Sequence, residues 1–284
     1  MDIFQFFSYA FVQRALLVGI LISAPCSMLG VFLVLRRMSL IGDGLAHVTF
    51  GGSALALAFK LYSTASLLVT LPIALLSSLG ILKLMEKARL SGDAAIGIVS
   101  ALGIATGVIM ASVGDGYNVD LLGYLFGNIL AITQEEVLIA AGLCCVVSTF
   151  LALFYHDLAA VTFNEELAKV SGVRVKFINT ALAFLTALSV VLAMKLVGVM
   201  LISSLLILPA ASALQLARSF RACVFLALLQ GCCSVMGGIL FSLMANLPAS
   251  ATIVLINFLC FCCAFLARWI RNFQRNGVIR QSRH

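Results

Sequence analysis

Long runs of apolar residues, separated by short polar joins, take up almost the whole chain. A membrane-spanning helix needs about 20 mostly apolar residues to cross a hydrocarbon core about 30 Å thick. Nine runs approach or exceed that length and predict nine spans, at residues 10–35, 46–61, 65–84, 94–113, 136–155, 175–194, 196–217, 222–245 and 250–270. The second run is short, and little more than Lys195 separates the sixth from the seventh, so eight or ten spans stay open.

The composition leaves no stretch for a separate water-soluble domain. Of the 284 residues, 63% are hydrophobic and only 10% are charged, whereas soluble domains are about 25% charged. We therefore predict a single all-α domain over residues 1–284, a polytopic transmembrane helical bundle. The first apolar run continues past Pro25 and lacks the basic start and cleavage site of a signal peptide, so we expect it to be retained as a helix.

Basic residues fall at alternate joins between the predicted spans. Of the 18 lysines and arginines, only Arg14, Lys60 and Lys195 fall on one side of the nine-span arrangement. Because basic residues gather on the cytoplasmic side, the C-terminus is predicted to be cytoplasmic and the N-terminus outside. The tail at residues 271–284 is then a basic cytoplasmic anchor at the lipid surface, and the net charge of +7 does not indicate nucleic-acid binding.

One carboxylate and one imidazole interrupt the apolar sequence in the segment RRMSLIGDGLAH, from Arg36 to His47. Asp43 and His47 are four residues apart, so a helix places them on one face, about 6 Å apart along its axis. Ionisable groups inside a membrane cost about 3 kcal/mol and usually face a cavity or a partner. A carboxylate with a neutral imidazole suits zinc, manganese or iron better than calcium or magnesium. Asp43 and His47 are therefore candidate metal ligands.

Two ligands do not complete a tight site. Tetrahedral zinc takes four, so the other donors would come from water, other helices or a symmetry-related subunit. An incomplete site suits a transported ion, which must also leave. The structural alternative is that Asp43 caps the second span while His47 makes a buried hydrogen bond.

The join at residues 156–176, on the basic side, is longer than a turn. Asn164 can cap a short helix, Glu165 and Glu166 suit its first turn, and Gly172 can end it. Such an amphipathic helix is either a solvated connection or a docking element for another protein.

The join at residues 114–134, on the opposite side, has an apolar middle that could re-enter the bilayer where protein or a cavity covers it. Its polar residues Asp115, Asn118 and Asp120 could meet an arriving cation. A solvated loop is the alternative, and we do not count these residues as ligands.

Small residues recur in the predicted spans: Gly103 with Gly107, Gly237 with Gly238, and Ser203 with Ser204. Small side chains let helices approach closely in membranes. We interpret them as packing positions.

Catalytic motifs are missing from the sequence. The three histidines do not form HExxH, and Asp43 is the only acidic residue well inside a predicted span, which argues against intramembrane proteases. No GxxxxGK[ST] loop occurs, so the energy for transport must come from a partner or a gradient. We predict a transport protein rather than an enzyme. A gradient-driven carrier stays an alternative, although the repeats and buried charges often found in such carriers are not evident.

Four segments resemble, in order, the permease subunits of bacterial metal-ion ABC importers, which take up zinc, manganese and chelated iron. They are RRMSLIGDGLAH (36–47), LFGNILAI (125–132), NEELAKVSGV (164–173) and VGVMLISSLLILPAASA (197–213). The first and last are the more specific. The family often has an aspartate where this chain has Asn128. If that carboxylate assists ion entry in the family, ion entry is expected to work differently in this chain.

The resemblance implies a large-type importer permease in the bacterial cytoplasmic (inner) membrane, paired with a second permease subunit that is either a copy or a sister permease. An extracytoplasmic metal-binding protein would deliver the ion, and two cytoplasmic ATP-binding subunits would drive transport, with no permanently bound cofactor. The family's paired aspartate and histidine match Asp43 and His47 as ion-coordinating residues.

The resemblance also implies that the 156–176 segment docks into the ATPase. The coupling residues would be Asn164, Glu165, Glu166, Lys169 and Gly172. They would convert nucleotide-driven closure into rigid-body helix movement. A permease for a metal chelate is a related alternative. Aspartate and histidine accept zinc, manganese and iron alike, so the sequence does not select the metal.

Overall fold

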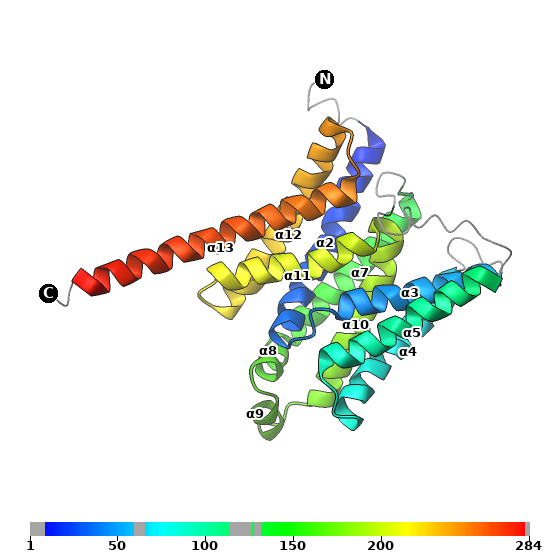
Figure 1. The fold of residues 1–284 in the computed structure, drawn as a ribbon, viewed down its shortest axis with the longest axis horizontal. Coiled ribbons are helices and arrows are strands. Elements are labelled where there is room, and N and C mark those ends of the chain that lie inside the picture. The colour runs from blue at the N-terminus through cyan, green and yellow to red at the C-terminus, as the bar shows by residue number, and fades with distance from the viewer. Residues whose placement is uncertain (1–8, 60–65, 114–126, 128–131, 282–284) are drawn as a thin grey trace.

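The computed structural model describes residues 9–59, 66–113, 127 and 132–281. Within these residues the chain is helical and contains no strand (Figure 1). The helices are α2 (Ala10–Leu35), α3 (Ile41–Ala58), α4 (Leu67–Lys87), α5 (Gly92–Val113), α7 (Gln134–Leu153), α8 (Tyr155–Phe163), α9 (Glu165–Val170), α10 (Val175–Val197), α11 (Val199–Leu216), α12 (Phe220–Ala245) and α13 (Ala249–Gln281). The predicted all-helical fold class is confirmed.

Eight of the described helices are long and apolar enough to cross a membrane: α2, α4, α5, α7, α10, α11, α12 and α13. The remaining predicted span is α3, whose 18 residues include Asp43 and His47 and extend about 27 Å. Protein encloses much of this helix, because α3 contacts α4, α5, α10 and α11. The chain is a multi-pass membrane protein with a helix at each predicted span.

Helices α2 and α10 form the centre of the bundle. In α2 and in α10, 67% of an 18-residue apolar stretch is buried inside the chain. The corresponding share is 22% in α4, α5 and α7. Helix α2 contacts α7, α11 and α12, while α10 contacts α3 and α4. Large apolar side chains such as Leu68, Leu138 and Phe225 are exposed on the peripheral helices. Such a surface suits hydrocarbon rather than water.

A tight turn joins α2 to α3 and so sets the direction of the helix that carries Asp43. Arg36 is the C-cap of α2, and Arg37 follows in the left-handed region at φ 56°. The Met38 N–H donates to the Leu33 carbonyl, which is the Schellman way of ending a helix. Arg36 and Asp43 therefore lie on either side of one short turn.

Small residues bring α3 against α5. A Cβ atom added at Gly103 would lie 2.7 Å from Val48 Cα and 2.9 Å from the His47 carbonyl oxygen. A Cβ atom added at Gly107 would lie 2.7 Å from the Phe50 ring. These distances are shorter than van der Waals contact, so the prediction that Gly103 and Gly107 are packing positions is confirmed.

The break between α10 and α11 lies at Gly198 rather than at Lys195, where the sequence suggested it. Gly198 has a φ of 88°, a conformation that glycine adopts without steric cost. Lys195 instead lies in the last turn of α10, with its Nζ 3.9 Å from Glu136 Oε1. Lys195 thus connects the ends of α10 and α7.

Candidate functional site

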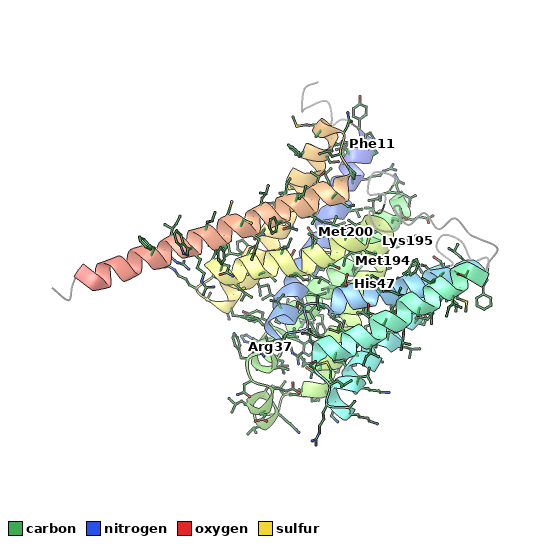
Figure 2. All side chains as sticks on the ribbon, viewed as in Figure 1. Phe11, Arg37, His47, Met194, Lys195 and Met200 are labelled. Carbon is green, nitrogen blue, oxygen red and sulfur yellow. The ribbon has the colours of Figure 1, made fainter. Side chains whose placement is uncertain are left out.

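Asp43 and His47 lie in the first half of α3, on the same face. His47 Nε2 is 3.6 Å from Asp43 Oδ2. Helix α3 begins after Leu40 without a side-chain cap, so Asp43 does not cap the helix as the structural alternative requires. Figure 2 labels His47 near the middle of the molecule, on a helix that contacts α10 and α11.

The partly exposed stripe of α3 carries both side chains. Leu45 is fully buried and Val48 is 4% exposed, whereas the side chains of Asp43 and His47 are 46% and 33% exposed. Half-buried residues continue this stripe at helical spacing: Phe50, Ser53 and Leu57. The pair therefore faces out from the single chain rather than into its own core.

The spacing of Asp43 and His47 fits two ligands of one ion. Histidine nitrogen and carboxylate oxygen bind zinc at about 2.0–2.1 Å, which puts two tetrahedral ligands about 3.3 Å apart. The observed 3.6 Å between Nε2 and Oδ2 is close to that separation and too long for a direct hydrogen bond. A small side-chain adjustment would bring both atoms onto one cation.

Ser203 in α11 contacts this pair. Its Oγ donates to Asp43 Oδ1 at 3.3 Å, so one carboxylate oxygen is held by Ser203 while the other faces His47. Hydrogen bonds of this kind orient metal ligands. The prediction that Ser203 and Ser204 are packing positions does not include this contact, although Ser203 lies in the specific segment at residues 197–213. Among the residues that the structure describes, no third His, Cys, Asp or Glu joins the pair.

The 156–176 join forms two short helices, α8 and α9, rather than the one that the sequence suggested. The Asn164 side chain caps α9 by accepting an N–H from its first turn at 3.0 Å. Glu165 and Glu166 occupy that turn, and Gly172, at φ 86°, follows the C-cap. The predicted cap, first turn and stop of this helix are confirmed.

Helix α9 projects from the end of the bundle together with α8 (Figure 1). Leu167 and Val170 are 64% and 86% exposed on it. They alternate with charged residues such as Glu166 and Lys169. An apolar surface rimmed by charge is typical of a protein-docking site.

A polar cluster of Arg36, Asn179 and Glu165, here called the Arg36 cluster, joins α9 to the α2–α3 turn. Arg36 Nη2 donates to Asn179 Oδ1 of α10 at 2.6 Å and lies 3.7 Å from Glu165 Oε2 of α9. The Asn179 amide donates to Glu165 Oε1 at 3.5 Å. The Arg36 side chain is only 12% exposed. Burial lowers the pKa of its guanidinium, and the nearby Glu165 carboxylate opposes that shift.

Most of the 114–134 join lies outside the described residues, and with it the candidates Asp115, Asn118 and Asp120. Among the described residues of this join, Thr133 forms a capping box with Glu136 at the start of α7. The proposed re-entry of this join into the bilayer stays a prediction.

The fold and the site together define a class of protein. It is a polytopic helical membrane protein with a carboxylate–imidazole pair on a largely enclosed helix and a short, exposed helix at one end. The model of the ABC 3 transport family matches residues 8–268. This chain belongs to that family. It is the transport subunit of an ABC transporter rather than an enzyme, and ATP hydrolysis resides in a separate subunit.

Individual relatives agree with the family. The chain is 31% identical to the manganese transport system membrane protein MntC of Halalkalibacterium halodurans over 261 residues, covering 92% of this chain and 88% of that protein. It is 34% identical to the high-affinity zinc uptake system membrane protein ZnuB of Haemophilus influenzae over 253 residues, covering 89% and 93%. The solved structure of PsaBC from Streptococcus pneumoniae in complex with Fab matches at a TM-score of 0.80 and 31% identity, covering 93% and 95%.

Proposed function

We propose that this chain is the permease of an ATP-driven importer that moves divalent transition-metal ions into the cytoplasm. The observation that carries the proposal is the Asp43–His47 pair, 3.6 Å apart on a helix largely enclosed by other helices. The ion is the cargo, and the chemistry asked of the permease is only to bind it and release it.

Manganese and zinc are the first candidates for the cargo. A mixed carboxylate and imidazole site accepts both ions, and the two relatives named above are a manganese and a zinc transport protein. Iron fits the same ligands by chemistry alone. The binding protein that delivers the ion would then do much of the selecting.

A second permease subunit would complete the site. Asp43 and His47 lie on the partly exposed stripe of α3. An isologous contact brings the same stripe of two subunits together across a two-fold axis. Two aspartates and two histidines would then give the four ligands of a tetrahedral site. A sister permease with the same pair would serve as well as a second copy.

The ATPase would act through α9. Its exposed Leu167 and Val170 would insert into the cytoplasmic ATP-binding subunit, with the charged coupling residues around them. The Arg36 cluster then connects the docked helix to the turn that starts the metal-binding helix. Closure of the ATPase would move α9, and α3 would follow as a rigid body.

The orientation that this mechanism needs agrees with the charge pattern. The end of the bundle that carries α9 also carries Lys83, Lys87 and Arg174. By the positive-inside rule, that end would lie in the cytoplasm and the N-terminus outside. The permease would lie in the bacterial cytoplasmic (inner) membrane. The extracytoplasmic metal-binding protein would then dock at the opposite end of the bundle.

The experiment that tests this function is uptake of zinc, manganese and iron into vesicles holding the chain with its ATPase and binding protein, each component omitted in turn. We expect uptake to require ATP and all three components. Uptake that persists without the ATPase but stops with the proton gradient would identify a secondary carrier. Uptake of a metal only as a chelate would identify a chelate permease.

The two proposed ligands are tested in the same vesicles. Asp43→Ala and His47→Ala are expected to abolish metal uptake while the permease still assembles with its ATPase. Normal uptake by both variants would contradict the assignment of Asp43 and His47 as metal ligands. It would not contradict membership of the family.

A further inference from the structure

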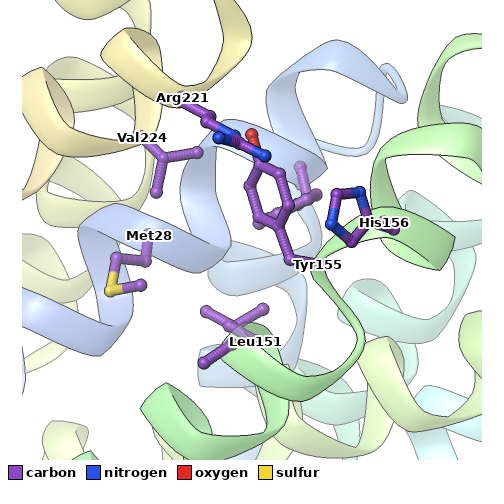
Figure 3. Close-up of a pocket in the computed structure, with 8 residues that line it drawn as sticks. Met28, Leu151, Tyr155, His156, Arg221 and Val224 are labelled. Atoms are coloured by element: carbon purple, nitrogen blue, oxygen red, sulfur yellow. The ribbon is translucent and has the colours of Figure 1, made fainter.

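A cavity of about 290 Å³ lies between α2, α7, α8 and α12, apart from the metal site (Figure 3). Its apolar wall comes from Met28 and Phe32 of α2, Leu151 of α7 and Val224 of α12. Tyr155, His156 and Arg221 also line it and supply its polar groups. None of the proposed metal ligands or coupling residues lines this cavity.

Arg221 supplies a positive charge to the cavity lining. The Arg221 guanidinium lies over the Tyr155 ring, 5.8 Å from its centroid, and the His156 ring meets the same tyrosine edge-on at 5.5 Å. Within the described part of the chain, no carboxylate lies within ion-pair distance of Arg221. A guanidinium stacked on a ring keeps its in-plane N–H donors available, and these suit the oxygens of a phosphate group.

The cavity changes from polar to apolar along the helices that form it. Arg221 lies in the first turn of α12, and Tyr155 and His156 follow directly after α7, so the polar groups lie at helix ends. Met28 lies seven residues before the end of α2, about 10 Å deeper along that helix. This is the order in which a phospholipid presents its phosphate and its acyl chain.

We propose that this cavity binds one anionic phospholipid, with its phosphate on Arg221 and His156 and one acyl chain along Met28, Leu151 and Val224. The polar residues of the cavity lie at helix ends on the basic side, the side on which anionic headgroups meet basic residues between transmembrane helices. A soluble partner is disfavoured because the apolar wall lies within the spans. The lipid would brace α8, which leads directly into α9.

The test is retention of lipid by the permease purified with its ATPase. The complex is exchanged into mixed micelles of phosphatidylglycerol and phosphatidylcholine, and the lipid retained per chain is counted by native mass spectrometry. Wild-type protein is expected to keep phosphatidylglycerol in preference to phosphatidylcholine. Arg221→Gln is expected to lower that retention about fivefold, as one basic contact near the surface predicts.

Two further variants separate charge from shape. Lys83→Gln removes a positive charge from an exposed position near the end of α4, away from the cavity lining, and is expected to retain lipid normally. Val224→Trp fills the apolar part without changing charge and is expected to lower retention of phosphatidylglycerol as Arg221→Gln does.

Three results would overturn the proposal. Equal retention by wild-type, Arg221→Gln and Val224→Trp protein would show that the cavity holds no lipid. Displacement of phosphatidylglycerol by millimolar inorganic phosphate would reduce the site to a simple anion site. Retention of phosphatidylglycerol by the permease alone but not by its complex with the ATPase would mean that the partner protein occupies the cavity.

Discussion

Replacing Ser203 by alanine tests whether the carboxylate of Asp43 is oriented for metal binding. Ser203 Oγ donates to Asp43 Oδ1 at 3.3 Å, while Oδ2 lies 3.6 Å from His47. Ser203→Ala leaves both proposed ligands in place and frees the carboxylate to rotate. It should weaken metal binding without abolishing it, unlike Asp43→Ala.

The size of the effect follows from the length of that hydrogen bond. A hydrogen bond to a charged group contributes about 1.5–3 kcal/mol. The contact at 3.3 Å is longer than the roughly 2.7 Å usual for a hydroxyl donor, so we assign it about 1 kcal/mol, or about fivefold in affinity. If two subunits present the same pair to one ion, both bonds are lost and the expected decrease is about 30-fold.

The assay is the metal concentration for half-maximal ATP-dependent uptake in vesicles. Ser204→Ala is the matched control, because Ser204 is the next residue along and its buried hydroxyl has no hydrogen-bond partner among the described residues. We expect Ser203→Ala to raise the half-maximal concentration between about fivefold and 30-fold, and Ser204→Ala to leave it within about twofold. Equal values for the two variants would refute the assigned role of Ser203.

Three further variants probe packing and coupling. Gly103→Leu should destabilise the bundle by about 3 kcal/mol or more and lower its thermal midpoint, because a Cβ atom would lie 2.7 Å from the α3 backbone. Gly97→Leu is the control, because a Cβ atom at Gly97 of the same helix meets open space. An equal decrease of the thermal midpoint in the two variants would contradict the packing argument. Arg36→Gln should leave the ATPase bound but raise the ATP hydrolysed per ion, and an unchanged ratio would count against the Arg36 cluster as a link. Changing Glu165 and Glu166 together to lysine should weaken ATPase binding in a pull-down, and full recovery of the complex would exclude the docking role.

Local patterns in the sequence predicted the helices and the placement of the candidate residues on them. Hydrophobic runs predicted the spans because a membrane leaves few alternatives to an apolar helix. Asn164 and Gly172 predicted the limits of α9 because capping depends on neighbouring residues only. The four-residue spacing placed Asp43 and His47 on one face before any tertiary contact was known.

Contacts between distant segments could not be predicted in the same way. Ser203 and Asp43 are 160 residues apart, and Arg36 and Asn179 are 143 apart. Their pairing depends on how α10 and α11 pack beside α2 and α3. The sequence also could not choose between Ser203 and Ser204, because adjacent small residues on an apolar helix look alike until one of them faces a partner. The break at Gly198 could not be predicted because glycine is also common inside membrane helices, so a glycine in an apolar run does not by itself mark a helix end.

The α2–α3 turn and helix α3 link the Arg36 cluster to the proposed metal ligands Asp43 and His47. The close packing of Gly103 against Val48 and His47 fixes α3 to α5, and α4, α10 and α11 also contact α3. A helix held in this way cannot bend easily, so a displacement entering at the α2–α3 turn must move Asp43 and His47 together. Both side chains lie on the partly exposed stripe, so in the proposed dimer that movement would change their distance to the second subunit rather than to their own core. Release of the ion would then follow from separating two half-sites, with each Asp43–His47 pair kept intact.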